Sequence, residues 1–438
     1  MILNYIKNPP IGGFFFKLHK INLMERKYIL SIDAGTTSSR AILFNKNAEA
    51  IGLVQYEFNQ FFPKEGWVEH DASEIYNTQL RAIKDVIKNS GISPSEIDSI
   101  GITNQRETTV IWNKDTGQPV YNAIVWQDRR TANFCDKFKE ENKSELIQNK
   151  TGLVIDAYFS GTKIKWILDS NSEIREQADK GQLIFGTIDT WLIWNLSKGK
   201  YHLTDPSNAS RTLLYNIKDD MWDDELLEIF NVPRIILPKV VDSSSISAYI
   251  DEEILGSKIP IAGIAGDQQA ALFGQLCVNP GDIKNTYGTG CFCMMNTGKS
   301  AVKSKNKMLS TIAWRINGEL TYALEGSVFV AGALIQWLRD KLAIIKDAPE
   351  VENLANTVKD NGGVTFIPAL SGLAAPYWDP YVQGTIFGIT RGTENGHIAR
   401  AALESIALRT RDIIIEMQKD ADINFTNLKV DGGASNNN

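Results

Sequence analysis

The clearest structural signal in the chain is the decapeptide Ser31-Ile-Asp-Ala-Gly-Thr-Thr-Ser-Ser-Arg40. It follows a short apolar strand, 28–32, and precedes another, 41–44, which predicts a β-hairpin whose turn is small and hydroxylated. Such a turn offers backbone N–H groups and hydroxyls to a phosphate, and Asp33 is suited to hold a hydrated Mg²⁺. A plain hairpin turn is the alternative, but the hydroxylated run before Arg40 favours a phosphate loop.

A second turn of this kind lies in the other half of the chain. The segment Asn285-Thr-Tyr-Gly-Thr-Gly-Cys-Phe292 places Gly288, Thr289 and Gly290 between two apolar stretches. Two such turns suggest an internal duplication in which each half grips one side of a nucleoside triphosphate. A third turn, Asp431-Gly-Gly-Ala434, follows another strand-like stretch and completes an order of two phosphate loops and an adenosine loop.

Between these turns the chain alternates strands and helices. A capping box, Asp71-Ala-Ser-Glu74, predicts a helix that Gly91 ends, and residues 99–103 return as a strand. Strand and helix pairs recur around 259–274, 326–338 and 384–412. The predicted class is α/β, with a seam between two halves near residue 275.

The two ends of the chain are expected to differ from the rest. Residues 1–23 show no helical or strand period, so we expect an unstructured leader and a possible start at Met24. At the other end a glycine turn after a strand normally leads into another element, which predicts a second domain truncated after Asn438. The expected domains are therefore 24–274 and an incomplete 275–438.

Composition excludes several classes of protein. The 438 residues carry 46 Lys and Arg against 52 Asp and Glu, and the net charge of -6 leaves no basic surplus for nucleic acid. No apolar run reaches the roughly 18 residues that a membrane span requires. Four cysteines are too few for a disulfide scaffold, which predicts a reducing, cytoplasmic compartment.

Longer motifs give a family resemblance. The three turns resemble the ATPase superfamily of actin, Hsp70 and sugar kinases. Residues 158–169, Tyr-Phe-Ser-Gly-Thr-Lys-Ile-Lys-Trp-Ile-Leu-Asp, and 384–389 with 397–404 are similar to the signatures of the FGGY carbohydrate kinases. Residues 101–109, 263–271 and 375–380 resemble the glycerol-phosphorylating members of that family. The resemblance implies two ribonuclease-H-like (actin-like ATPase) domains with a cleft between them, and a homo-oligomer, either dimer or tetramer.

The resemblance also implies roles for individual residues, with glycerol as substrate and ATP and Mg²⁺ as cofactors. Arg106 and Glu107 follow a strand, and a guanidinium donor beside a carboxylate acceptor satisfies a hydroxyl fully. Asp267, near a helix N-terminus whose dipole favours its charge, is implied as the base that accepts the hydroxyl proton. Further implied glycerol contacts are Trp126, Tyr158, Gln268 and Phe292. Implied nucleotide and Mg²⁺ contacts are Asp33, Thr36, Thr37, Ser38, Arg40, Gly288, Thr289, Gly290, Gly332, Gln336, Gly433 and Asn437.

Three simpler interpretations remain open for these residues. Arg106 and Glu107 also suit a surface ion pair, the aromatic residues suit a core, and Asp267 suits a helix cap. An actin- or Hsp70-like ATPase acting on a protein partner shares the phosphate loops, and a kinase for another polyol or a pentulose shares the whole pattern. Lys258 stands where regulated members of the family have an arginine for a sugar bisphosphate, which leaves effector control open.

Overall fold

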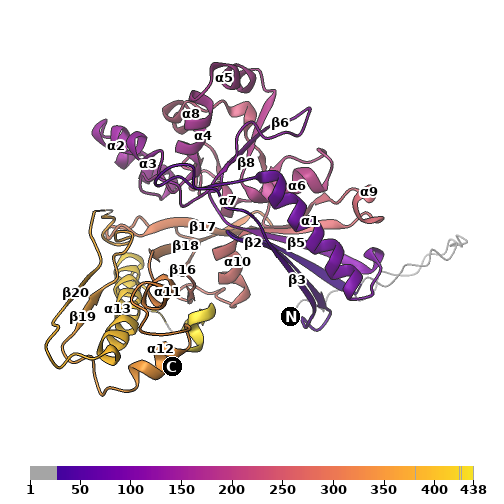
Figure 1. Ribbon diagram of the computed structural model, residues 1–438. Helices are drawn as coiled ribbons and strands as arrows, with labels where there is room; N and C mark the ends of the chain where they lie inside the picture. The colour runs from indigo at the N-terminus through magenta and orange to yellow at the C-terminus, as the bar shows by residue number, and fades with distance from the viewer. Residues whose placement is uncertain (1–26, 380, 424, 426, 438) are drawn as a thin grey trace, which may run out of the picture.

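The computed structural model describes residues 27–379, 381–423, 425 and 427–437, and the structural statements below refer to these. The leader expected over 1–23 lies outside the described residues. Two mixed sheets, one in each half of the described chain, organise the fold (Figure 1).

The first sheet has six strands whose order places three parallel strands side by side. In space they are β13 (Ser244–Tyr249), β14 (Pro260–Gly266), β5 (Ile97–Asn104), β1 (Tyr28–Ala34), β2 (Ser38–Asn45) and β3 (Ala50–Glu57). Strands β1, β2 and β3 form an antiparallel meander, while β5 runs parallel to β1 and β14 runs parallel to β5. The carboxyl ends of β1, β5 and β14 are level, because Ala34 and Gly266 both pair with Asn104. Ligands of open α/β sheets bind at this edge.

Helix α1 (Ala72–Asn89) and helix α6 (Ile188–Leu196) pack on the first sheet. Apolar residues at helical spacing, Ile75, Ile83 and Val86, turn the buried face of α1 toward strands β1 to β3. Half of the predicted capping box is present, since Asp71 accepts hydrogen bonds from the N–H groups of Ser73 and Glu74. The other half is wrong, because the Glu74 carboxylate accepts from Asn59 instead.

A second core of the first half lies beside this sheet and contains Phe159, Leu213 and Phe230. The elements that surround it or connect it to the sheet are short, and the helices around this core lie in the upper part of Figure 1. They are β4 (Glu69–His70), η1 (Pro94–Glu96), β6 (Val110–Asn113), β7 (Ala123–Ile124), α2 (Ala132–Glu140), α3 (Ser144–Thr151), α4 (Ser160–Asp169), α5 (Ser172–Asp179), β8 (Leu183–Gly186), β9 (Leu203–Thr204), α7 (Pro206–Ala209), β10 (Tyr215–Asn216), β11 (Met221–Trp222), α8 (Asp224–Phe230), η2 (Arg234–Ile236), β12 (Lys239–Val240) and α9 (Glu252–Leu255).

The second sheet repeats the topology of the first. In space it contains β17 (Leu309–Ile316), β18 (Glu319–Val328), β16 (Cys291–Gly298), β15 (Ile283–Tyr287) and β21 (Leu428–Asp431). Strands β15, β16 and β18 are antiparallel neighbours, as β1, β2 and β3 are, and β21 runs parallel to β15 as β5 does to β1. The predicted internal duplication is therefore supported by four strands of each sheet, while β13 and β14 of the first sheet and β17 of the second have no counterpart among the described strands.

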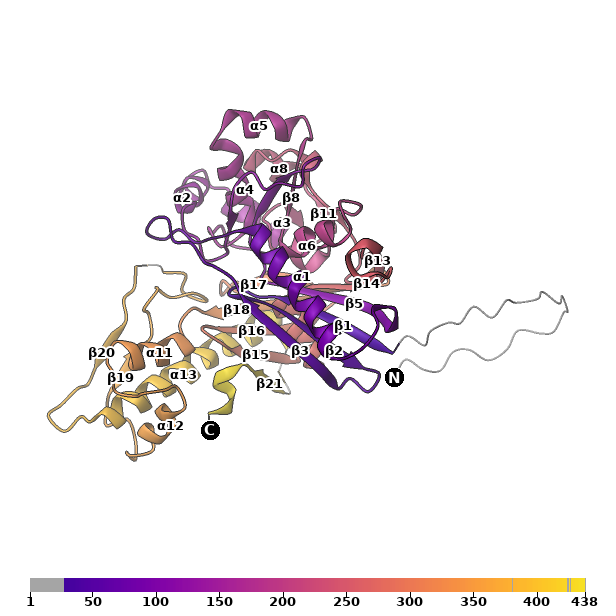
Figure 2. The same cartoon turned by 45° about the vertical axis from the view of Figure 1, so that its right-hand side comes forward.

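Helices cover the second sheet and connect it to the first. Helix α10 (Asp267–Gly274) follows β14 directly and leads from one sheet to the other. Helix α13 (Asn395–Ala421) packs against β16 and β18 and also against the outer layer of the second half (Figure 2). That layer contains α11 (Gly332–Asp340), α12 (Glu350–Ala355), β19 (Thr365–Ile367) and β20 (Thr385–Phe387), and the described chain closes with η3 (Gly433–Asn436).

Candidate active site

A cleft of about 1400 Å³ lies between the two halves. Pockets for one small molecule usually measure roughly 300–1,000 Å³, so this cleft has room for two substrates side by side. The predicted site residues that line it are Thr36, Thr37, Arg106, Glu107, Trp126, Tyr158, Asp267, Gln268, Gly288, Thr289, Gly290 and Phe292. The structure therefore brings together residues from both predicted phosphate loops and from the predicted polyol site.

Arg106 leaves the carboxyl end of β5 and is 2% exposed. Its Nη1 and Nη2 donate to the two carboxylate oxygens of Glu325, on β18, at 2.5 and 3.1 Å. Its Nε lies 3.3 Å from Oδ1 of Asp267, and Nη2 donates a longer bond of 3.4 Å to the hydroxyl of Tyr158. The guanidinium is thus fixed between the cleft and a carboxylate of the other half, which excludes the surface ion pair as its interpretation.

Glu107 belongs to the same buried cluster of charges. Oε1 of Glu107 accepts a bond of 2.7 Å from Nε of Arg211, whose Nη2 donates to Oε1 of Glu325 at 3.0 Å. Burial would raise the pKa of Glu325, but the charges of Arg106 and Arg211 outweigh burial and lower it to about 2. Burial raises the pKa of Glu107, and the negative charge of Glu325 raises it further. The charges of Arg106 and Arg211 offset this rise only in part. Glu325 and Arg211 were not predicted, since the signal for Glu325 was only one acidic residue within an apolar strand.

The backbone at Arg106 and Glu107 is shaped for this placement. Glu107 has a φ of 61°, in the left-handed region that non-glycine residues avoid, and its carbonyl accepts from the hydroxyls of Ser160 and Thr109. Gly266, at the end of β14, leaves room for Arg106, because a Cβ there would lie 2.7 Å from the arginine side chain. A strained residue held by two side chains is typical of a functional turn.

Asp267 is the first residue of α10, and its side chain is 37% exposed to the cleft. The N-cap is Gly266, so the alternative in which Asp267 caps the helix is wrong, although Oδ1 of Asp267 accepts from the Gln268 N–H at 2.7 Å. The amide oxygen of Gln268 accepts a short hydrogen bond from Nζ of Lys284, on β15. This contact leaves the amide N–H groups of Gln268 free to donate to a ligand.

Lys284 was also missed by the sequence analysis. It is fully buried, and its Nζ donates to the Thr286 hydroxyl at 2.9 Å and to the Phe292 carbonyl at 3.2 Å. Burial lowers the pKa of Lys284 to about 8, against the opposing charges of Asp267 and Asp431. The lysine thereby links the second phosphate hairpin to Gln268.

Three aromatic rings form one wall of the cleft. Trp126 packs edge to face against Tyr158, with ring centroids 5.6 Å apart, and against Phe292 at 6.1 Å. Trp126 also donates from Nε1 to the Thr36 hydroxyl at 3.0 Å, which connects this wall to the first hairpin. Trp126 and Phe292 are half-buried and line the cleft, so they present apolar surface to a ligand.

The first predicted phosphate loop is the turn between β1 and β2. Thr36 and Thr37 line the cleft, and Asp33 is half-buried with Arg40 Nη1 at 3.6 Å. Ser38 and Arg40 do not line it, because the Ser38 hydroxyl and Arg40 Nε both contact Gln55 on β3. These two side chains are therefore directed along the sheet.

Asp33 fits a Mg²⁺ site that phosphates complete. Burial raises the pKa of Asp33, Arg40 works against this shift, and the nearby Asp267 adds to it. A divalent cation would offset both burial and repulsion. Mg²⁺ is usually held by one or two carboxylates with water and phosphate oxygens. Within the described part of the chain no cluster of three or more acidic, histidine or cysteine side chains offers an all-protein alternative.

The second predicted phosphate loop, Gly288 to Gly290, joins β15 to β16 and abuts the start of α11. The carbonyl of Gly288 accepts from Gly332 N–H at 3.0 Å, and that of Thr289 accepts from Ala331 and Ala333 at 2.9 and 3.0 Å. A Cβ at Gly290 would lie 2.5 Å from the carbonyl oxygen of Val328, so only glycine fits without a shift. The loop forms a narrow cradle of backbone, which suits phosphate.

The predicted adenosine contacts lie outside the cleft lining. Gly332 contacts Gly288 through the bond just described, and Gln336 is exposed one turn further along α11. Gly433 and Asn437 lie in and after η3, next to β15. All four therefore lie close to the hairpin or to strand β15 of the second sheet.

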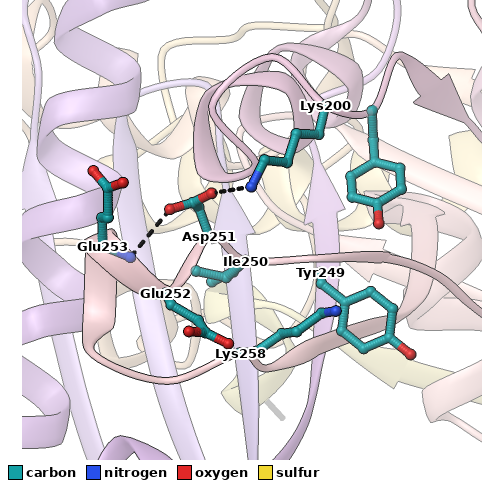
Figure 3. Close-up of a pocket in the computed structure, with 8 residues that line it drawn as sticks. Lys200, Tyr249, Ile250, Asp251, Glu252, Glu253 and Lys258 are labelled. Carbon is teal, nitrogen blue, oxygen red and sulfur yellow. Dashed lines mark hydrogen bonds and ion pairs between the residues drawn. The ribbon is translucent and has the colours of Figure 1, made fainter.

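A separate hollow of about 320 Å³ contains Lys258 (Figure 3). Lys200 donates to Asp251 at 2.5 Å, and the Lys258 ammonium lies 4.6 Å from the centre of the Tyr249 ring. The hollow shares no lining residue with the cleft. Its cations already have partners, and it takes no part in the site described above.

Comparison with known proteins places this fold and site in one family. The chain matches the N-terminal domain of the FGGY family of carbohydrate kinases over residues 28–274 and the C-terminal domain over 283–438. The chain therefore belongs to the FGGY family of carbohydrate kinases. This membership excludes the actin- or Hsp70-like ATPase as its identity.

Within the family, the relatives named here are glycerol kinases. The chain is 60% identical to glycerol kinase 2 of Thermotoga maritima and 60% identical to the glycerol kinase of Nitratidesulfovibrio vulgaris, each over 94% of this chain and 83% of the relative. The crystal structure of Plasmodium falciparum glycerol kinase with ADP superposes with a TM-score of 0.87 at 38% identity, over 94% of this chain and 83% of that one. Among the described residues, no helix is both long and apolar enough to cross a membrane.

Proposed function

We propose that this chain is a glycerol kinase, which transfers the γ-phosphate of ATP to a terminal hydroxyl of glycerol and forms sn-glycerol 3-phosphate and ADP. The observation that carries the proposal is the meeting of Arg106, Glu107 and Asp267 with both hairpins in one cleft. The relatives named above, at 60% identity, support glycerol as the substrate.

The polyol is held by complementary donors and acceptors. Arg106 and the Gln268 amide donate to glycerol hydroxyls, while Glu107 and Asp267 accept from them. Trp126 and Phe292 cover the carbon skeleton, and the Tyr158 hydroxyl adds a contact at one end. A buried site built this way discriminates strongly against a ligand that lacks a hydroxyl, because its polar groups would stay unpaired.

Asp267 is the proposed general base. It accepts the proton of the terminal hydroxyl as that oxygen forms its bond to the γ-phosphorus. The bond from the γ-phosphorus to the bridging oxygen breaks at the same time, and its electron pair leaves with ADP. The nearby Arg106, with Nε 3.3 Å from the carboxylate, orients Asp267.

The nucleotide is proposed to lie along the second sheet with its phosphates between the two hairpins. Backbone and hydroxyl groups at Thr36, Thr37 and 288–290 hold the phosphates. Ser38 and Arg40 stabilise the first turn through their contacts with Gln55 on β3. Asp33 would hold Mg²⁺, which would supply positive charge to the phosphate oxygens. The residues proposed to border the ribose and adenine are Gly332, Gln336, Gly433 and Asn437.

Two properties of the whole protein belong to the proposal. We infer a reducing, cytoplasmic compartment, supported by the four cysteines, which are free and buried. We also infer a homo-oligomer, either dimer or tetramer, by resemblance to the family. Size-exclusion chromatography with light scattering measures the oligomeric state directly.

The test of the proposed function is a comparison of substrates. The purified protein is assayed for ADP formation with ATP and Mg²⁺ and with glycerol, xylulose or gluconate as acceptor. We expect kcat/KM to be highest for glycerol, with no turnover when Mg²⁺ is chelated. A higher kcat/KM for xylulose or gluconate would show that the protein is a kinase for another substrate and not for glycerol.

A further inference from the structure

Glu325 lies behind the proposed polyol site without lining the cleft. It is fully buried on β18, in the middle of the second sheet, and does not contact the cleft itself. Its carboxylate accepts three hydrogen bonds within the described part of the chain, two from Arg106 and one from Arg211, both arginines of the first half. One carboxylate of the second half therefore holds two cations of the first.

The contact with Arg106 fixes the direction of the guanidinium. Nη1 and Nη2 meet the two oxygens of Glu325 at 2.5 and 3.1 Å, which is an end-on bidentate pair. Because the guanidinium is planar, fixing these two nitrogens also fixes Nε, which then faces Asp267 at 3.3 Å. Nη1 also donates to Gln269 Oε1 at 3.3 Å, which holds the plane of the group from a third side.

Glu325 reaches Glu107 through Arg211. Oε1 of Glu325 accepts from Arg211 Nη2 at 3.0 Å, and Arg211 Nε donates to Oε1 of Glu107 at 2.7 Å. The contacts of the Glu107 carboxylate within the described residues are thus made by Oε1, which leaves Oε2 for a hydroxyl. Arg211 is itself fully buried and does not line the cleft, so it acts as a connection between the two carboxylates.

We propose that Glu325 is a positioning residue for the polyol site, which orients Arg106 directly and Glu107 through Arg211. The proposal rests on the proposed function and deepens it. Its consequence is that the first half recognises the polyol only while the second half is docked against it. Glu325 keeps its charge throughout the physiological pH range, since the pKa lies far below it.

The experiment compares Glu325→Gln and Glu325→Asp with wild type. Gln keeps the shape but not the charge, and Asp keeps the charge but withdraws the carboxylate by one methylene. We expect both to raise the KM for glycerol by at least about tenfold and to lower kcat, because misplacement of a binding group by about 1 Å can cost about 10²-fold. The KM for ATP is expected to change much less, since neither arginine contacts the hairpins.

Ser327→Ala is the matched control. Ser327 is buried two residues further along the same strand, and its hydroxyl has no hydrogen-bond partner among the described residues. We expect its KM values and kcat to stay at the wild-type level. Arg211→Lys is a second test of the connection, because lysine keeps the charge but lacks the two separate nitrogens with which Arg211 contacts Glu107 and Glu325. It is expected to raise the KM for glycerol less than Glu325→Gln does.

The outcomes separate this inference from the proposed function. If the wild-type protein prefers another polyol, glycerol is overturned as its substrate. The role of Glu325 is then tested with that polyol, by the ratio of the KM of the variant to the KM of wild type. If Glu325→Gln fails to fold, Glu325→Asp decides. A lowered melting temperature with an unchanged polyol KM in the variants that fold would overturn the positioning role, and a wild-type protein that phosphorylates no polyol would contradict both statements.

Discussion

The hairpin between β1 and β2 and the hairpin between β15 and β16 occupy equivalent positions in the two sheets, yet they offer different chemistry. The first carries Asp33 and Arg40, which face each other across the strands at 3.6 Å. The second, 288–290, carries no charge, and its carbonyls are occupied by the N-terminus of α11. In this duplicated fold part of the strand order is repeated, whereas the two carboxylates proposed to hold Mg²⁺ and to accept the proton, Asp33 and Asp267, both lie at the edge of the first sheet.

The buried charges of the second sheet act at a distance from the cleft. Lys284 on β15 holds Gln268, and Glu325 on β18 holds Arg106. Both recipients belong to the first half and line the cleft. We therefore propose that the first sheet presents Arg106 and Gln268 to the polyol and that the second sheet orients them, which predicts different consequences for substitutions in each sheet.

The largest effect is expected at the first sheet. Asp267→Asn removes the proton acceptor but keeps the shape, so kcat should fall by at least about two orders of magnitude while glycerol binding changes far less. Turnover assays and calorimetry of glycerol binding measure the two quantities. The control is Asp282→Asn, whose carboxylate accepts from the Asn279 N–H outside the cleft. Wild-type kcat in Asp267→Asn would remove Asp267 from the reaction.

A pair of glycine substitutions compares the two hairpins directly. Gly290→Ala places a Cβ 2.5 Å from the Val328 carbonyl oxygen, and this crowding should cost about 1–3 kcal/mol of unfolding free energy and raise the KM for ATP. Gly35→Ala meets only the Ser38 carbonyl oxygen, at 3.3 Å, and should change stability by less than about 1 kcal/mol. Denaturant unfolding and ATP kinetics give both values. Equal losses in the two variants would contradict the difference in crowding.

A smaller kinetic effect is expected at Lys284. Lys284→Met frees the Gln268 amide, so the KM for glycerol should rise severalfold with little change in kcat. The pKa of this lysine is lowered to about 8 in the folded protein from 10.5, so between these pH values the unfolded state binds more protons and stability rises with pH. This rise in the free energy of unfolding reaches at most about 3 kcal/mol. It should be missing in Lys284→Met.

Unfolding curves of wild type and Lys284→Met at pH 7.5 and 9.5 measure this difference. Lys429→Met is the control, because the ammonium of Lys429, on β21, donates to the backbone carbonyl of Gln275 at the end of α10 and is only part-buried. Stabilities of wild type and Lys284→Met that change in parallel over this range would contradict the lowered pKa of Lys284.

The turns and single elements of the fold were predictable from sequence because each depends on residues that are neighbours in the chain. The turn 33–39 and the loop 288–290 were found from small and hydroxylated residues, and both are hairpin turns in the structure. Arg106 and Asp267 were identified by the resemblance of their segments to the family, and their places after predicted strands agreed with it. The capping box at Asp71 was predicted only in part, since the competing partner of Glu74 lies in a preceding loop that no local pattern indicates.

The residues that orient the site could not be predicted from sequence, because their contacts depend on residues far away in the chain. Glu325 and Arg106 are 219 residues apart in sequence, and their contact depends on how the two halves dock. Lys284 looked like a polar residue in a short strand, and its burial follows from the register of β15 against β16 and β21. The direction of Ser38 likewise depends on its neighbour Gln55 in β3.

The central claim, that one cleft transfers phosphate from ATP to a polyol, is tested most directly by following the phosphate. The protein is incubated with Mg²⁺, glycerol and ATP labelled on its γ-phosphate, and the labelled products are separated and counted against ADP. We expect one labelled glycerol phosphate for each ADP formed, with label on a terminal oxygen. Label released as inorganic phosphate, with glycerol left unlabelled, would contradict the account.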